Sequence, residues 1–507
     1  MSLVYDAIII GSGLGGLSCG AYLSRNNWKV LIIEKHNRPG GYATSFRRGH
    51  YLFDSTLHMI NGVGNNQNMA RFFEFCGVAE NIEFLKLKYM MRLIFPEHDI
   101  QIPSGDLEGV IKIFEDNFPN EKEGIKKLFK EMTLIYKDVV KFFNVTAPMW
   151  QQLPIFPFRY KSLFRSMKKT IQQLLDKYLK DDKLKTLLFA NYGFFGLPIS
   201  KLDMLALAGN FDFWAEGAYY PKGGSQNIPN AFVDLIKNHN GEFLFDTEVT
   251  SIIVEKGRAI GVATKNGEQH FGKNIISNAS AMETFHNLVG DEKLPVKFLK
   301  KMNGMEPSDS FFKVYIGLDS NFKEKFENSD DYEFVVFETY DQDEDYEWML
   351  NCDFEKASFL ITLHSNIDDS LAKGDRFVVS ISQKQPFRYW KNYESAYTDG
   401  LKMEYNKEKD RIASVLLERV EKIIPEFSAH IDVIEIATPL TLRRYTNNFN
   451  GATYGWANTV SQFTPMDRMG KIPVKNLDLC SAWTFPGEGQ ASTVVCGYRL
   501  GKKLVKK

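Results

Sequence analysis

The chain has 507 residues, more than one hydrophobic core usually holds, so we expect two or three packed units. Its 62 Lys and Arg residues balance 63 Asp and Glu residues, which argues against a nucleic-acid partner. No apolar run reaches the roughly 20 residues that cross a bilayer, and no secretory signal precedes the first strand. We therefore expect a cytoplasmic or peripheral membrane protein.

A glycine-rich turn follows the first predicted strand, a β-branched run at residues 7–10. Gly11, Gly13 and Gly16 stand at the spacing of a dinucleotide-binding turn. The first glycine makes the tight turn, the second lets a pyrophosphate approach the backbone, and the third lets helix and strand pack closely. The next strand ends at Glu34, about 20 residues further on, where a carboxylate accepts protons from ribose hydroxyls. Together these features predict a bound dinucleotide without a 2′-phosphate.

A second turn, Pro39-Gly40-Gly41, continues past this acid. It resembles the segment with which flavoproteins of the two-dinucleotide-binding-domain type touch their cofactor a second time. Simple NAD dehydrogenases do not usually carry it. The alternative is a turn between two strands that binds nothing. The position of the turn favours FAD.

Regular elements return from Gly217 onward. We expect a helix over about 229–238 and strands at 242–245, 249–255, 259–264 and 274–280. Near the end, the pattern predicts a strand at 477–483, a Gly/Pro turn and a helix over 491–504. The N-terminus of that last helix could stabilise negative charge at the pyrimidine edge of a flavin.

Two intervening segments have a different composition. Residues 71–216 carry Lys, Phe and Leu at helical spacing, whereas residues 291–436 mix strand-like runs with one helix. The acidic run 340–347 contains no His, so we expect an exposed loop and not a metal site. The five cysteines lack a CxxC pair, which predicts reduced structural cysteines and no bound metal.

Aromatic residues concentrate in two places. The first group predicts an aromatic-lined substrate tunnel, although an ordinary core would look the same; its members are Phe194, Phe195, Phe211, Phe213, Trp214 and Tyr219. The second place is residues 147–169, where aromatic and basic residues such as Trp150 and Phe158 alternate. Such a segment can lie among lipid headgroups, so we expect possible peripheral membrane contact there. The alternative is a connecting loop packed on the protein.

The order of the motifs GSGLGGL, PGGYATSF, YYPKGGSQ, TPLTLRRYT and AWTFPGEG resembles the phytoene desaturase, carotenoid isomerase and retinol saturase superfamily of FAD-dependent oxidoreductases. The resemblance covers about residues 1–65, 217–290 and 437–507. It implies an α/β fold: a Rossmann-like FAD-binding domain (1–70, 217–290 and 437–507) with an inserted α+β substrate domain (71–216 and 291–436). It also implies noncovalent FAD, an apolar substrate tunnel, and desaturation, saturation or flavin-assisted isomerisation at C=C bonds of a hydrophobic polyene or isoprenoid lipid.

The glycine turns and the resemblance together give a set of expected cofactor contacts. These are Gly11, Gly13, Leu14, Gly15, Gly16, Glu34, Lys35, Gly40, Gly41, Tyr42, Ala43, Val249, Ser481, Gly487, Glu488 and Gly489. The backbone of Val249 is expected beside the adenine. Many relatives carry Gly-Asp where this chain has Ser481 and Ala482, so the ribityl chain must be held there by the Ser481 hydroxyl, a backbone N–H or water.

Two residues are candidate catalytic groups. His58 changes charge near neutral pH and follows the motif that leads to the cofactor; the alternative is a histidine hydrogen-bonded beside the flavin with no proton role. Glu488 could act as an acid or tune the flavin potential, or it could point to solvent from a turn. Two other functions share the architecture: an amine-oxidase-like flavoenzyme and a non-enzymatic isoprenoid-binding escort protein. The intact glycine turns and Glu34 argue against the escort protein.

Overall fold

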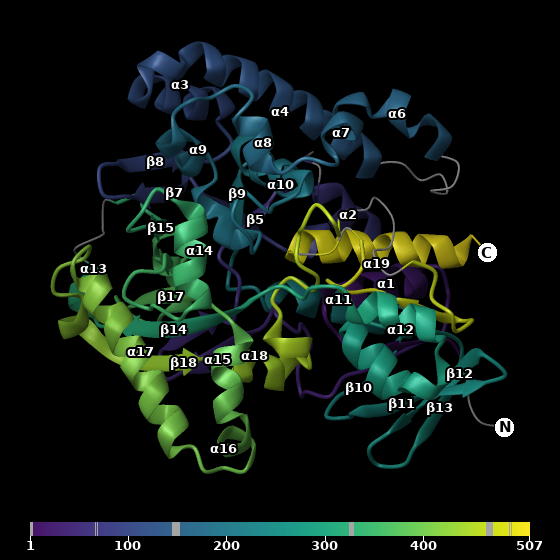
Figure 1. The fold of residues 1–507 in the computed structure, drawn as a ribbon. Helices are drawn as coiled ribbons and strands as arrows, with labels where there is room; N and C mark the ends of the chain where they lie inside the picture. The colour runs from purple at the N-terminus through teal and green to yellow at the C-terminus, as the bar shows by residue number, and fades with distance from the viewer. Residues whose placement is uncertain are drawn as a thin grey trace.

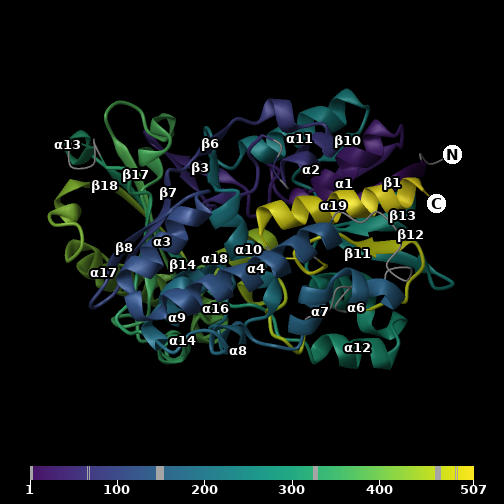
Figure 2. The same ribbon diagram turned by 90° about the horizontal axis from the view of Figure 1, so that it is seen from above.

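The computed structural model describes residues 4–65, 67, 69–143, 153–323, 329–462, 470–485, 487 and 489–506. Two seven-stranded sheets stand side by side, and a group of helices lies across one end of both (Figures 1 and 2). Both ends of the chain lie beside the first sheet.

The first sheet begins with β1 (Val4–Ile10), whose apolar residues are buried as expected for a central strand. In spatial order its strands are β10 (Glu242–Leu244), β2 (Val30–Ile33), β1, β13 (Gln269–Ser277), β12 (Arg258–Thr264) and β11 (Val249–Glu255), and β19 (Leu477–Leu479) pairs with β13. Strands β10, β2, β1, β13 and β19 run parallel to one another, while β12 pairs antiparallel with both β13 and β11. The predicted strand at 249–255 coincides with β11. The expected Rossmann-like α/β class is confirmed.

Three helices pack beside this sheet: α1 (Leu14–Arg25), α11 (Asn227–Asn238) and α19 (Gln490–Val505). The contact between α1 and α19 is unusually close. A Cβ added to Gly497 would collide with the Gly15 carbonyl oxygen, and the Ser18 hydroxyl donates to the Val494 carbonyl oxygen at 2.7 Å. The first and last helices of the chain therefore meet backbone to backbone, because no side chain stands between them at this point.

The second sheet is mostly antiparallel. Its strands in spatial order are β18 (Ile431–Ala437), β14 (Ser310–Leu318), β17 (Phe377–Gln385), β16 (Phe359–Thr362), β15 (Glu333–Val336), β7 (Tyr89–Ile94) and β8 (Asp99–Pro103). Alternate residues of β14, such as Phe312 and Val314, enter an apolar core that includes α17 (Met403–Glu421). The residues between them, including Lys313, belong to the opposite face, which is also buried. Charged side chains on that face consequently lie inside the molecule.

The helices across the end come mainly from the part of the chain between β8 and β9 (Ala218–Pro221). They are α3 (Leu107–Asn117), α4 (Lys122–Phe143), α6 (Phe156–Arg159), α7 (Lys161–Ser166), α8 (Ile171–Leu175), α9 (Asp182–Leu188) and α10 (Met204–Ala215). Helix α4 packs against α3, α7 and α10. Smaller elements used below are β4 (Tyr51–Asp54), β5 (Ile60–Asn61), η4 (Ala190–Phe194), η7 (His364–Asn366) and α18 (Pro439–Thr446).

The acidic run 340–347 is not the expected exposed loop. Helix α14 (Gln342–Leu350) begins inside it, and the Asp341 carboxylate accepts hydrogen bonds from the backbone N–H groups of Asp343 and Glu344. Acidic side chains in a first turn also meet the positive end of the helix dipole. The charge run therefore starts a helix, and Asp345 within it is fully buried. Among the residues that the structure describes, no cluster of His, Cys, Asp or Glu could hold a metal ion.

Candidate functional site

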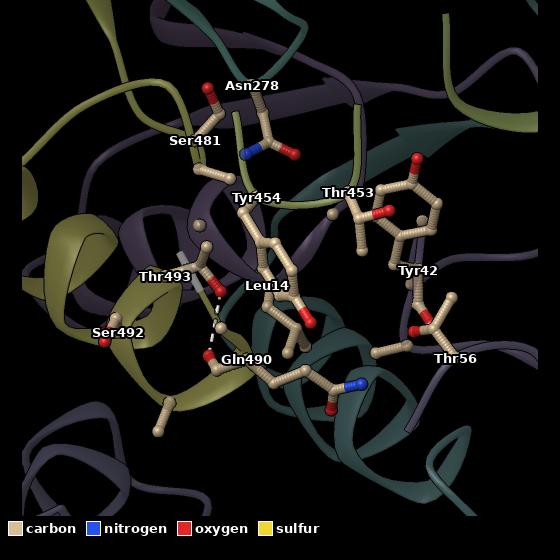
Figure 3. A pocket seen from close by; sticks show the side chains of 18 of the residues that line it. Leu14, Tyr42, Thr56, Asn278, Thr453, Tyr454, Ser481, Gln490, Ser492 and Thr493 are labelled. Atoms are coloured by element: carbon tan, nitrogen blue, oxygen red, sulfur yellow. Dashed lines mark hydrogen bonds between the residues drawn. The ribbon is translucent and has the colours of Figure 1, made fainter. Parts of the chain in front are cut away.

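A cavity of about 440 Å³ runs from the first glycine turn towards the helices across the end of the molecule. Its walls come from the β1–α1 turn, the turn at Gly40, the segment after α18 and the first turn of α19 (Figure 3). At its other end the lining passes to α4, η4 and α10. Segments far apart in the chain thus share one cavity.

The β1–α1 turn presents bare backbone to this cavity. Gly13 is the N-cap of α1 and no side chain caps the helix, so its first N–H groups remain available to an anion. A Cβ at Gly13 would collide with the Asn278 side-chain oxygen, and a Cβ at Gly15 would lie 2.6 Å from the Cys480 carbonyl oxygen. Gly16 lies outside the lining residues, where an added Cβ would lie 2.7 Å from the Gly11 carbonyl oxygen. Gly16 therefore serves the close helix packing that its position predicts.

The acid at the end of β2 is buried and already oriented. One oxygen of Glu34 accepts hydrogen bonds from the backbone N–H and the hydroxyl of Ser12, at 2.8 and 2.7 Å. The other accepts from the backbone N–H of His36 at 3.0 Å. Sequence reasoning did not single out Ser12, which stands between two of the turn glycines. Lys35 lines the same end of the cavity and donates to the Asn447 side chain at 2.6 Å, and burial lowers the pKa of its amine.

The second glycine turn packs directly on the first. The Gly40 N–H donates to the Ser12 carbonyl oxygen at 2.9 Å, and Gly40 pairs with Gly13 as a parallel bridge. Both Gly40 (φ 125°) and Gly41 (φ 59°) adopt backbone conformations that favour glycine. Tyr42 and Ala43 continue the wall, and the Tyr42 hydroxyl donates to the Ala452 carbonyl oxygen at 3.1 Å. The two turns thus form one cradle of small residues.

The C-terminal part of the chain closes the cavity. Gly489, which has no side-chain cap either, starts α19, and Gln490 extends from it across the cavity in Figure 3. Both polar side-chain atoms of Gln490 are buried and, within the described part of the chain, have no hydrogen-bond partner. The same holds for the hydroxyl of Thr453, which lines the opposite wall. Ser481 lines the cavity and donates to the Ala279 carbonyl oxygen at 3.1 Å.

These features fit a dinucleotide with two charged or polar ends. Two uncapped helix N-termini face one cavity, and the buried groups of Gln490 and Thr453 need partners that the protein does not supply. Val249, the predicted adenine contact, is among the residues that line the cavity. Gly487 is not among the lining residues, and Glu488 lies outside the described residues. The roles of the individual residues remain predictions.

The far end of the cavity is mostly apolar, with Tyr136 of α4 and Asp212 of α10 as polar members of its lining. Three of the six aromatic residues expected in a tunnel, Phe194, Phe195 and Phe213, line it together with Val139 and Val140 of α4. The other three are core residues: the ring of Trp214 packs 5.5 Å from that of Phe129, and Phe211 lies 5.0 Å from Tyr136. The sequence could not separate the two groups. Whether an aromatic side chain lines the cavity or packs in the core depends on the direction in which it points, and on α10 this differs between Phe213 and its aromatic neighbours.

His58 lies where this apolar part meets the second sheet. Its Nδ1 atom is 2.6 Å from Glu333 Oε2 on β15 and 2.8 Å from the Thr362 hydroxyl on β16. Its Nε2 atom is 3.3 Å from Lys313 Nζ on β14. Burial, together with the charge of Lys313, holds the pKa of His58 well below its usual value. The imidazole is therefore neutral at neutral pH and is held by groups on three strands.

Sequence reasoning missed Glu333 and Lys313. Burial raises the pKa of Glu333 to about 8 and lowers that of Lys313 to about 8. A signal was present: each is a lone charge in a run of apolar, strand-forming residues, YEFVVF and FFKVYIGL. A buried charge is destabilised by desolvation, so a lone charged residue in a buried strand is expected to have a charged or hydrogen-bonding partner.

A Rossmann-like sheet, paired glycine turns and an enclosed apolar lobe are the features of a flavin-dependent oxidoreductase. The profile of the family described as "Flavin containing amine oxidoreductase" matches residues 14–370, so the chain belongs to this family. It is 26% identical to the chloroplastic prolycopene isomerase of Daucus carota over 99% of this chain and 80% of that protein. It is 24% identical to all-trans-retinol 13,14-reductase of Rattus norvegicus over 94% of this chain and 81% of that protein.

The fold is similar to that of a solved putrescine oxidase with putrescine bound, with a TM-score of 0.65, 11% identity and full coverage of both chains. The expected placement in the phytoene desaturase, carotenoid isomerase and retinol saturase superfamily is confirmed. The chain is a flavin-dependent oxidoreductase, which favours the enzyme over the escort protein. Within the described residues no helix is long and apolar enough to span a membrane.

Proposed function

We propose that the chain binds FAD in this cavity and acts on C=C bonds of a hydrophobic polyene or isoprenoid lipid. One observation carries the proposal: a single cavity joins a dinucleotide cradle of bare backbone to an apolar lobe lined by Phe194, Phe195 and Phe213. The cradle fits the adenosine and pyrophosphate, and the lobe fits a long apolar chain. When bound, the flavin supplies hydride or electron transfer.

The protein's own residues would position and isolate the reactants. Glu34 would accept the ribose hydroxyls, and the N–H groups at the start of α1 would meet the pyrophosphate. The start of α19, with Gln490, would face the polar edge of the isoalloxazine. The apolar lobe excludes water from the reacting carbon atoms. His58 stands at the wall of this lobe as one of its titratable groups, together with Tyr136 and Asp212.

The proposed domains are a discontinuous FAD-binding domain (1–70, 217–290 and 437–507) and a substrate domain (71–216 and 291–436). The origin of the strands supports this division. The first sheet takes its strands from residues 4–33, 242–277 and 477–479. The second takes its strands from residues 89–103, 310–385 and 431–437.

Membrane contact is a further part of the proposal. On α6 and α7, the exposed fractions of Phe158 and Phe164 are 85% and 49%, and the basic residues Arg159, Lys161 and Arg165 stand beside them in the chain. An exposed aromatic and basic face of this kind suits a lipid headgroup region, from which an apolar substrate would enter. Residues 144–152, which include Trp150, lie outside the described residues.

The test is the spectrum of the purified protein followed by product analysis. Flavin absorbance bands and release of FAD on denaturation are expected. After anaerobic reduction, the holoenzyme should change the saturation or geometry of at least one member of a panel of carotenoids, retinoids and unsaturated fatty acids. Turnover of amines with no reaction of any polyene would instead establish the amine-oxidase alternative, and a protein that cannot take up FAD would refute the proposal.

A further inference from the structure

Three ionisable side chains meet behind the cavity wall. His58 is the member of this group that lines the cavity; Glu333 and Lys313 lie behind it with exposed fractions of 0% and 2%. The imidazole bridges them, since Nδ1 is 2.6 Å from Glu333 Oε2 and Nε2 is 3.3 Å from Lys313 Nζ. A neutral ring with one nitrogen on each partner can pass a proton from one side to the other.

Two arrangements of protons satisfy the same contacts. In the first, Nδ1–H of His58 donates to the ionised Glu333, and Nε2 accepts from the Lys313 ammonium group. In the second, protonated Glu333 donates to Nδ1, and Nε2–H donates to the neutral Lys313 amine. They differ by two proton shifts and have the same net charge, so exchange between them leaves no unpaired charge in the buried site.

We propose that His58, Glu333 and Lys313 form a proton relay that serves the cavity, with Glu333 as its buried proton reservoir. In the donating step, the Nε2 proton leaves for an acceptor atom in the cavity and the N–H electron pair stays on Nε2. The Glu333 O–H proton then passes to Nδ1, the carboxylate keeps the negative charge, and uptake of one proton from solvent by the Lys313 amine restores the first arrangement. The relay rests on the proposed function for its acceptor, because saturating a C=C bond requires a proton as well as a hydride.

The electrostatic surroundings support such a relay. Burial raises the pKa of Glu333 to about 8 and lowers that of Lys313 to about 8, which makes the protonated carboxyl and the neutral amine of the second arrangement more accessible than in water. Three other titratable groups surround the relay: Asp54 on β4, Tyr332 directly before β15, and His364 in η7. The charge of Asp54 raises the pKa of Lys313. The pKa of His364 is itself lowered by burial and by His58, so this second imidazole stays neutral.

The relay can be tested without substrate. We would record long-range ¹H–¹⁵N spectra of the ¹⁵N-histidine-labelled holoenzyme between about pH 6 and 10, with His58 assigned from the spectrum of His58→Gln. The wild-type Nδ1 and Nε2 shifts should move together with a midpoint near pH 8, because loss of a proton from the Glu333–Lys313 pair leaves an ionised Glu333 that fixes the ring as the Nδ1–H tautomer. In Glu333→Gln the amide cannot take up a proton, so the ring should hold one tautomer and the titration should disappear.

Matched variants separate the relay from a structural role. Glu333→Asp keeps the carboxyl group and should retain the titration. Lys313→Met removes the other partner of His58 and should abolish the titration. This variant also keeps the test decisive if Glu333→Gln does not fold. Glu435→Gln, which removes a surface carboxylate from β18 of the same sheet, should have no effect. Identical titrations in the wild type and Glu333→Gln would overturn the relay.

A second readout connects the relay to catalysis. With a panel substrate that reacts, Glu333→Gln should lower kcat about 10²- to 10⁴-fold while KM changes little, because general acid catalysis contributes about that much. An unchanged kcat would also overturn the proposal. If no panel member reacts, the proposed function fails, and the histidine titration still decides whether the relay exists.

Discussion

Glu34 shows how much a single residue contributes to the cradle. Its two oxygens are already held by Ser12 and by the backbone N–H of His36, and its exposed fraction is only 8%. The carboxylate is thus oriented before any ligand arrives, with lone pairs left for the ribose hydroxyls. A preorganised acceptor of this kind loses little conformational entropy on binding.

Replacing Glu34 with Gln should weaken FAD binding about 10- to 100-fold, because a hydrogen bond to a charged group contributes about 1.5–3 kcal/mol. The measurement is the dissociation constant from titration of apoprotein with FAD, followed by flavin fluorescence. Glu242→Gln, a change on β10 of the same sheet, serves as the control and should leave the constant unchanged. Equal affinities for Glu34→Gln and wild type would show that the ribose lies elsewhere.

Single residues also mark the limit of sequence reasoning. The glycines and Glu34 were predictable because turn, helix and acid follow one another along the chain. The relay was not predictable, because His58 is 255 residues from Lys313 and 275 residues from Glu333 in the chain, and the three meet only through the order of strands in the second sheet. The lone charges in FFKVYIGL and YEFVVF indicate that something is buried there, but not which partner each one meets.

At the scale of elements, prediction succeeded where local pattern and tertiary packing agree. Strand β11 and helix α19 lie within a few residues of their predicted ranges. The prediction of an exposed loop at residues 340–347 was wrong, because a high density of charged residues was taken as a sign of exposure. Asp341 instead caps α14, and Asp345 accepts hydrogen bonds from the Ser358 N–H and hydroxyl, a partner that sequence does not reveal.

The short helices α6 and α7 lead to a prediction about membranes. Phe158→Ser combined with Phe164→Ser should weaken binding to vesicles of phosphatidylcholine and phosphatidylserine by about tenfold or more, because burying each ring in lipid contributes about 1.5–3 kcal/mol. Co-sedimentation with such vesicles is the measurement. Leu401→Ser changes an equally apolar exposed residue in another part of the molecule and should have no effect. If the wild type does not bind these vesicles, the membrane proposal is wrong.

For the whole molecule, the cavity is lined by segments that lie far apart in the chain. Its walls include the first turn of α1, the segment after α18, the start of α19 and the helices of the apolar lobe. A ligand that touches all of them adds contacts that exist only in the folded protein. Binding should therefore stabilise the complete molecule and not only the first sheet.

FAD should raise the unfolding temperature of the apoprotein. At a concentration about 100 times its dissociation constant, a ligand that binds only the folded state contributes about 2.7 kcal/mol. Differential scanning calorimetry with and without FAD is the measurement. In Gly13→Ala the new Cβ would collide with Asn278, so FAD should cause little or no shift; Gly304→Ala, at a helix end outside the cavity lining, should show the same shift as the wild type. A full shift in Gly13→Ala would place the cofactor away from this turn.

The glycine contact between α1 and α19 has a consequence for biosynthesis. Helix α1, which would meet the pyrophosphate, lies most of the chain length before helix α19, which locks against it through Gly497 and Gly15. Synthesis therefore has to continue past Gly497 before this contact can form. We expect a chain truncated before Gly497 to lack the contact and to take up flavin poorly.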